Sequence, residues 1–192
     1  MHAFILRCAA ATLLGGIAVP AVAETETWVI DPAHTYPSFE FPHMGISVWR
    51  GKFSSTSGTI TLDREARTGS VDVAIDPDSI DFGADDMHEH ARSANWFDVA
   101  KFPTATYKGA IRFDGEVPAA VDGELTVRGV TRPLTLTIEH FKCIPHPMSG
   151  KQVCGADASG ELHWSEFGMY KMDDPEADKV RLSIQVEAQK QG

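Results

Sequence analysis

The sequence predicts an all-β fold in which eight antiparallel strands close into a barrel, with one or two short helices. Three observations predict it. Polar and apolar residues alternate in eight separate segments, and turn-forming residues separate those segments. One stretch, residues 84–94, lacks the alternation and contains good helix formers. Half-buried strands in succession favour antiparallel pairing over units of parallel strands joined by helices.

The first alternating segment shows the pattern most fully. Thr35, Pro37, Phe39, Phe41 and His43 share one face of the predicted strand, and the residues between them share the other. The eight segments are residues 35–43, 58–63, 70–76, 104–113, 124–128, 134–140, 160–165 and 179–187. Turn residues lie between them at 63–69, 114–115, 128–129 and 145–150.

Eight such strands do not remain one open, twisted sheet with a clean apolar face, so they close into a barrel or stack as a sandwich. The interior of an eight-stranded barrel is filled by side chains or holds one small ligand. The long strands and the single helix, residues 84–94, favour the barrel. The alternation alone leaves the sandwich open.

The first 23 residues are typical of a secretory signal peptide. Arg7 is a short positive region, the apolar run Cys8–Val19 follows, and Ala21–Ala23 has the form of a cleavage site. The run is shorter than the roughly 20 residues that span a bilayer, which disfavours a retained anchor. We therefore expect export to the periplasm, cleavage after Ala23 and one mature domain, residues 24–192.

Charge restricts the classes of partner. The chain carries 27 aspartates and glutamates against 17 lysines and arginines, a formal net charge of −10 at pH 7. Such a protein is repelled by the phosphates of nucleic acid and by anionic lipid headgroups. Nucleic-acid binding is therefore not an expected function, and uncharged partners are favoured.

Two cysteines, Cys143 and Cys154, follow the predicted cleavage site. An even pair in an exported protein is typical of one disulfide. A zinc site is disfavoured because no second pair of cysteines or histidines lies at zinc spacing.

Several motifs, taken in order, resemble those of the YceI family of polyisoprenoid-binding periplasmic proteins. The most specific is Gly-x-Leu-Thr-x-x-Gly-Val-Thr-x-Pro, which begins at Gly123 and ends at Pro133. The others are His34 through Gly45, Gly51 through Phe53, Asp78 through Asp81, Arg92 through Asp98, Phe102-Pro103, Cys154 through Asp157 and Glu166 through Met169. The resemblance covers nearly all of the predicted mature chain.

This resemblance implies a lipocalin-like barrel with an apolar tunnel that holds a polyisoprenoid chain, an isoprenoid quinone or a fatty-acid derivative. The candidate lipid-binding residues are the side chains expected to face the interior: Phe39, Phe41, His43, Phe53, Val73, Ile75, Trp96, Phe97, Phe102, Tyr107, Ile111, Leu125, Leu136 and Phe167. Phe113 is also expected inside. For the aromatic members, the alternative is an ordinary packed core.

Polar candidates are few. His43 shares a face with Phe39 and Phe41, so it is either a hydrogen-bonded core histidine or a polar contact for a quinone carbonyl or an amide headgroup. The helical stretch with Trp96 and Phe97 lies outside the strand pattern and is our candidate for covering the mouth of the tunnel. His90 and Arg92 are the candidate headgroup contacts there.

The sequence favours a binding protein over an enzyme. It contains no Gly-x-Ser-x-Gly motif of a serine hydrolase. His88 and His90 are two residues apart and face different directions on a helix, so we expect no metal and no catalytic cofactor.

The predicted function is therefore carriage of a long isoprenoid lipid by a monomer or homodimer. The alternatives are a lipid-modifying enzyme of the periplasm and a soluble interaction partner, for which the resemblance suggests a membrane cytochrome that handles quinones.

Overall fold

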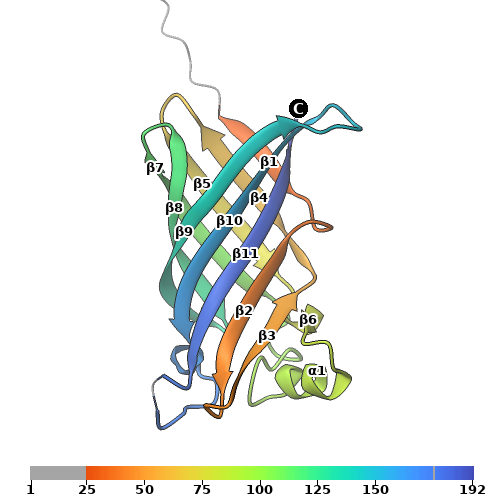
Figure 1. Cartoon of the computed structure of the whole chain (residues 1–192), viewed down its shortest axis with the longest axis vertical. Helices are drawn as coiled ribbons and strands as arrows, with labels where there is room; N and C mark the ends of the chain where they lie inside the picture. The colour runs from red at the N-terminus through yellow and green to blue at the C-terminus, as the bar shows by residue number, and fades with distance from the viewer. Residues whose placement is uncertain (1–24, 175) are drawn as a thin grey trace, which may run out of the picture.

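The computed structural model describes residues 25–174 and 176–192. The strands in this part of the chain form one closed antiparallel barrel with a short helix at one end (Figure 1). Their bounds are β1 (Glu26–Ile30), β2 (Tyr36–His43), β3 (Ser47–Phe53), β4 (Thr56–Asp63), β5 (Thr68–Ile75), β6 (Ile80–Asp81), β7 (Ala105–Asp114), β8 (Val117–Val127), β9 (Val130–Pro145), β10 (Gln152–His163) and β11 (Lys179–Lys190). The helices are η1 (Pro77–Ser79), α1 (Asp85–Arg92) and η2 (Trp164–Phe167).

The strand segments make eight wall positions. β1 and β2 share one position because both pair with β11, with Ile30 opposite Ala188 and Tyr36 opposite Gln185. β3 and β4 share the next position, since β3 pairs with β2 and β4 pairs with β1. β5 and β6 share the third, and the pairing of β1 with β11 closes the ring. Each of the eight predicted segments occupies its own position, so the predicted barrel is confirmed over the sandwich.

Three strand segments were not predicted, because each is short or interrupted. β1 offers only Trp28 and Ile30 as inward residues, and β6 has two residues in all. β3 contains Gly51 among charged residues, which hides its alternation. Phe39 on β2 pairs with Gly51, and its ring covers this glycine. A Cβ atom at position 51 would lie only 2.6 Å from the Phe39 ring, so a residue with a side chain does not fit there.

The predicted segment 160–165 ends early, because β10 stops at His163 and the chain turns into η2. The predicted helix at 84–94 is confirmed as α1, with Asp85 and Asp86 in its first turn, where carboxylates favour the helix dipole. α1 lies at the end of the barrel where β2 finishes and β3 begins (Figure 1).

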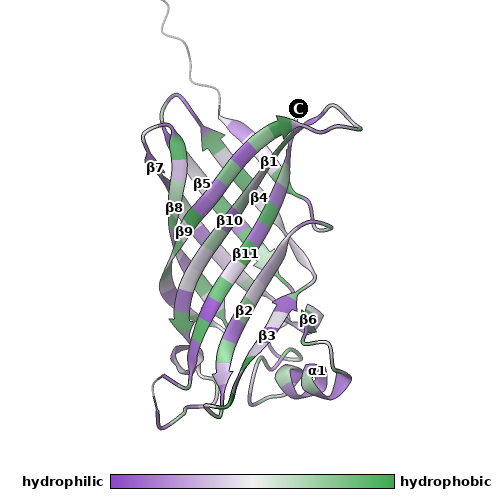
Figure 2. Ribbon diagram, viewed as in Figure 1, coloured by the Kyte–Doolittle hydropathy of each residue, from purple (hydrophilic) through white to green (hydrophobic). Residues whose placement is uncertain are grey.

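Apolar and polar residues alternate along the strands of the wall, as the colour bands on β9 and β11 in Figure 2 show. The apolar residues make up the inner face, among them Leu134 and Leu136 on β9. On the inner face, the Tyr107 hydroxyl lies 3.0 Å from the carbonyl oxygen of Val121 and 2.9 Å from that of Leu134. The Tyr107 ring covers Gly123, where a Cβ would lie 2.7 Å from the ring. This contact requires a residue without a side chain on the facing strand.

At the end of the barrel opposite α1, a disulfide lies among buried apolar side chains. Cys143 and Cys154 are joined in a disulfide between β9 and β10, as the cysteine count predicted. The disulfide packs in one cluster with Trp28, Leu62 and other apolar side chains. Arg64 donates to the Cys143 sulfur at 3.0 Å.

The predicted signal peptide, residues 1–23, lies outside the described residues. Among the residues that the structure describes, none of the helices is long and apolar enough to cross a membrane.

Removal of the disulfide should lower stability without opening the barrel. The loop between Cys143 and Cys154 is short, with a separation of 11 residues. The double change Cys143→Ser and Cys154→Ser should therefore lower the free energy of unfolding by at most about 3 kcal/mol, measured by urea denaturation. Thiol labelling of the unfolded, unreduced mature protein should find no free cysteine. Two reactive thiols would contradict the bond.

Candidate functional site

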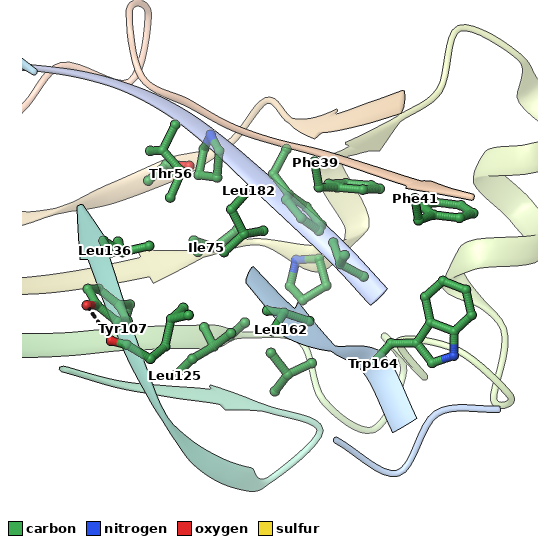
Figure 3. A pocket seen from close by; sticks show the side chains of 18 of the residues that line it. Phe39, Phe41, Thr56, Ile75, Tyr107, Leu125, Leu136, Leu162, Trp164 and Leu182 are labelled. Carbon is green, nitrogen blue, oxygen red and sulfur yellow. Dashed lines mark hydrogen bonds between the residues drawn. The ribbon is translucent and has the colours of Figure 1, made fainter. Parts of the chain in front are cut away.

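A cavity of about 740 Å³ lies inside the barrel, within the size range of pockets that hold small-molecule ligands. Its lining is almost entirely apolar and comes from all eight wall positions, with α1 and η2 contributing at one end. Figure 3 shows Phe39 and Phe41 on one side of this space and Tyr107, Leu125 and Leu136 on another. The inner face is therefore not filled by its own side chains.

The structure brings nearly all of the predicted interior residues to this cavity. The lining includes Phe39, Phe41, His43, Phe53, Val73, Ile75, Trp96, Phe97, Tyr107, Ile111, Leu125, Leu136 and Phe167. The alternation that placed Thr35, Pro37 and His43 on one face of β2 with the two phenylalanines is confirmed, since all of them line the cavity.

Phe102 was expected to face the interior, and this expectation is wrong. It lies in the turn before β7, which begins at Ala105, so strand alternation does not govern its direction. Its ring instead lies beside Gly129 and under the Lys101 ammonium group, 5.0 Å from the ring centre. Phe113 is half-buried and packs against the core cluster without lining the cavity, after a register shift in its pairing with β8.

Polar atoms along the cavity wall are largely satisfied by the protein itself. Thr35 donates to the backbone carbonyl of Glu187 and accepts from its amide. Burial raises the pKa of the Tyr107 phenol, so this group stays neutral. Among the described residues, two buried side-chain polar atoms have no hydrogen-bond partner, the Thr56 hydroxyl on the cavity wall and the Trp28 indole N–H, which does not line the cavity. The wall thus favours an apolar occupant.

The mouth of the cavity is built from tryptophan and histidine side chains. His43 stacks on Trp49 with ring centres 3.8 Å apart. The Trp96 indole N–H donates to His90 Nε2 at 2.8 Å, and the Trp96 ring lies 5.3 Å from that of Trp164. Met44 and Tyr170, which also line the cavity, are strongly exposed, so the cavity reaches the surface at this end.

The two predicted headgroup residues have different positions. His90 lines the cavity at the mouth. Arg92 does not line it. Its guanidinium donates to the carbonyl oxygen of Asp78 and pairs with the Asp78 carboxylate at 2.9 Å. Arg92 therefore attaches α1 to η1 and does not point at the opening.

Sequence reasoning missed several lining residues, among them Trp49, Phe82, Met87, Trp164 and Met169. Trp49 alternates with Gly51 and Phe53, a pattern that could have revealed β3. Trp164 follows the end of β10, and only the turn into η2 places its ring against Phe41, with ring centres 5.3 Å apart (Figure 3).

An ion pair positions Trp164. His163 Nδ1 lies 2.7 Å from the Asp178 carboxylate, and the backbone amide of Trp164 donates to the carbonyl oxygen of Asp178. The hydrogen bond with Asp178 raises the pKa of His163, although burial opposes it. Burial alone would raise the pKa of Asp178, but hydrogen bonds from Ser165 and His163 lower it.

No group of three or more His, Cys, Asp or Glu side chains that could hold a metal occurs within residues 25–174 and 176–192. The histidines and the carboxylate of the described lining, His43, Asp86 and His90, all lie near the mouth.

Comparison with known proteins gives consistent results. The model of the YceI-like domain matches residues 28–188. A UPF0312 protein of Enterobacter sp. (strain 638) is 33% identical over 160 residues, which cover 82% of each chain. Protein YceI of Salmonella arizonae is 32% identical, and the alignment covers 82% of this chain and 83% of the relative.

Solved structures show the same fold. BcnA of Burkholderia cenocepacia superposes with a TM-score of 0.65 at 22% identity, covering 82% of this chain and 98% of BcnA. A polyisoprenoid binding domain from Saccharophagus degradans, implicated in plant cell wall breakdown, superposes with a TM-score of 0.59 at 14% identity. That match covers 85% of this chain and 98% of the domain.

The pair of His163 and Asp178 makes stability depend on pH. The contribution of His163 is fully present below its unfolded pKa of 6.5 and is lost as pH rises through the raised folded value. The contribution of Asp178 is present above 3.8 and is lost as pH falls through its lowered value. Between about pH 6 and pH 9, wild-type stability should therefore fall more steeply than that of His163→Asn, measured by urea denaturation. Equal slopes would contradict this assignment.

Proposed function

The chain belongs to the YceI-like domain family, and from this membership we propose that it binds and carries one long isoprenoid lipid, such as a polyprenyl chain or an isoprenoid quinone, in the periplasm. The tail occupies the barrel and the headgroup lies at the mouth. The protein acts as a binding protein, as a monomer or homodimer, and performs no catalysis.

The observation that carries this proposal is the apolar cavity of about 740 Å³ that opens at one end of the barrel. Burial of one CH₂ group gains roughly 0.8 kcal/mol, so one isoprene unit gains about 3–4 kcal/mol before ordering costs are subtracted. Four or five units approach the ceiling of non-covalent affinity. A tail of this length needs no strong polar anchor, in agreement with a wall whose polar groups are mostly paired with the protein.

The kind of ligand is supported from two sides. The Saccharophagus degradans domain with the same fold is described as polyisoprenoid binding. In the present chain, the two histidines of the lining are engaged by tryptophans, His43 with Trp49 and His90 with Trp96. Neither imidazole contacts a lining carboxylate that would make it a general base, which favours binding over chemistry on the lipid.

The cavity also sets the length of tail that it encloses. On β10 the lining runs from Ala156 to Leu162 and continues to Trp164, a stretch of about 20 Å along the barrel axis at about 3.3 Å per residue and about 40° of tilt. An extended isoprene unit covers roughly 5 Å, from four backbone bonds of about 1.5 Å projected along the chain. A straight tail therefore fits about four units.

A carboxylate in the wall should remove the ligand. Phe41 lines the cavity between Phe39 and Trp164, and Phe41→Asp would place an unpaired charge in apolar surroundings. We expect the variant to lose the lipid that organic extraction and mass spectrometry recover from the wild type, whereas Phe41→Leu keeps it.

The matched control is Ser38→Asp, which adds a carboxylate to the outer face of the same strand, across from Lys52. It should retain the lipid. Circular dichroism checks that the Phe41→Asp variant is folded. If the folded variant retains its full lipid content, Phe41 does not belong to the binding wall. A wild-type extract with no prenyl or acyl chain would contradict lipid carriage itself.

Affinity should depend on tail length up to the capacity of the cavity. In titrations of the delipidated protein with prenyl quinones that differ only in tail length, we expect affinity to rise steeply to about four units and then level off. Units beyond the mouth stay in water and return no burial energy. A constant slope through about eight units would mean that the cavity encloses a longer tail than its lining on β10 allows.

A further inference from the structure

We propose that the rim of the cavity mouth is a docking surface for the uncharged or zwitterionic face of a lipid bilayer, through which the cavity takes up and releases its lipid. The rim consists of the β2–β3 hairpin and residues 168–174 after η2, which lie at the same end of the barrel as α1 (Figure 1). This inference rests on the proposed function, because lipid carriage requires a route between the cavity and a membrane.

Apolar side chains are exposed on this rim. At the hairpin, Met44 is 72% exposed and Ile46 is 78% exposed, and Val48 follows at the start of β3. Tyr170, in the loop after η2, is 61% exposed. Met44 and Tyr170 also line the cavity, so the exposed apolar surface continues directly into the interior.

The fold holds these side chains outward. Met44 and Gly45 both have positive φ, 52° and 71°, and the Ile46 amide donates to the His43 carbonyl, which makes a tight turn. The stack of His43 on Trp49 lies directly behind this turn. On the other side of the mouth, the Trp164 indole N–H donates to the Tyr170 carbonyl at 2.7 Å. Hydrogen bonds and ring stacking therefore fix the backbone of the rim on both sides of the mouth.

Energetics identify the occupant as a bilayer. A prenyl tail that left the mouth into water would lose about 0.8 kcal/mol for every CH₂ group exposed. A continuous apolar path from the cavity to the hydrocarbon of a membrane avoids that loss. Tyrosine and tryptophan, which surround this mouth, are the side chains that favour the boundary between lipid and water.

Charge restricts the kind of bilayer. Exposed carboxylates flank the mouth, with Asp85, Asp86 and Glu89 on α1 and Asp173 and Asp174 before β11. They are repelled by anionic headgroups over about a Debye length, roughly 10 Å at 0.1 M salt. The rim therefore suits an uncharged or zwitterionic surface, and anionic lipid should weaken docking unless salt screens the repulsion.

The opposite end of the barrel supplies a matched control. Met148, in the turn between β9 and β10, is 90% exposed, and Val117, at the start of β8, is 52% exposed. Neither residue lines the cavity. If exposed apolar side chains alone caused membrane association, both ends would contribute equally.

The test is flotation of the mature protein with phosphatidylcholine vesicles and with mixed phosphatidylcholine and phosphatidylglycerol vesicles, at low and high salt. The rim variant carries Ile46→Asp and Val48→Asp, two exposed rim residues that do not line the cavity. The control carries Met148→Asp and Val117→Asp. If the rim variant unfolds, Ile46→Ser with Val48→Ser replaces it.

We expect the wild type and the control variant to float with phosphatidylcholine vesicles. We expect the affinity of the rim variant for these vesicles to be lower by a factor of about ten or more. Phosphatidylglycerol should reduce wild-type binding at low salt only. Equal flotation of the wild type and the rim variant, or no flotation of the wild type, would overturn the docking surface.

A titration with a short, water-soluble prenyl quinone separates this inference from the proposed function. The folded rim variant should bind the quinone as the wild type does, because the interior is unchanged. Vesicle binding without quinone binding in the wild type would refute the proposed function and leave the docking surface standing. Equal loss of quinone and vesicle binding in the rim variant would overturn the docking surface as a separate feature.

Discussion

The structure depends on the ladder that joins β11 to both β1 and β2, because this ladder closes the barrel. The chain leaves the wall between β1 and β2, and Thr35 replaces the missing backbone contacts there. Its hydroxyl donates to the carbonyl of Glu187 and accepts from the Glu187 amide, and the residue is 2% exposed. A closed ring leaves no strand edge, so the backbone polar groups of the wall are paired with one another.

Closure explains why the interior remains apolar. With the backbone paired in the wall, the inner face presents mainly aliphatic and aromatic side chains, and the Tyr107 phenol is held by two carbonyl groups. The two ends of the barrel then differ. At one end the disulfide and Trp28 pack among buried apolar side chains, whereas at the other end tryptophans line the cavity. The cavity reaches the surface at the end of the barrel that carries the tryptophans.

The mouth combines fixed and exposed elements. Trp164 is positioned by the His163–Asp178 pair, and Trp96 by its hydrogen bond to His90. Around these fixed rings, the hairpin and the loop after η2 expose apolar side chains to water. A rigid inner ring favours retention of a tail, and an exposed outer rim favours contact with the surface from which the tail comes. The two proposals thus describe consecutive parts of one apolar path.

The sequence by itself determined which side chains face inward along most strands. Alternation is a local property with a period of two residues, so it placed Thr35 to His43, the inner residues of β5 and those of β7 as far as Ile111 correctly. The break in the alternation at residues 84–94 indicated the helix, and the cysteine count indicated the disulfide. Only the tertiary structure decided closure over stacking, the existence of β1, β3 and β6, the outward position of Phe102 and the place of Trp164 at the mouth. These features depend on pairing between residues far apart in the chain, such as Trp28 with Lys190, and on the direction of turns, and neither leaves a periodic signal.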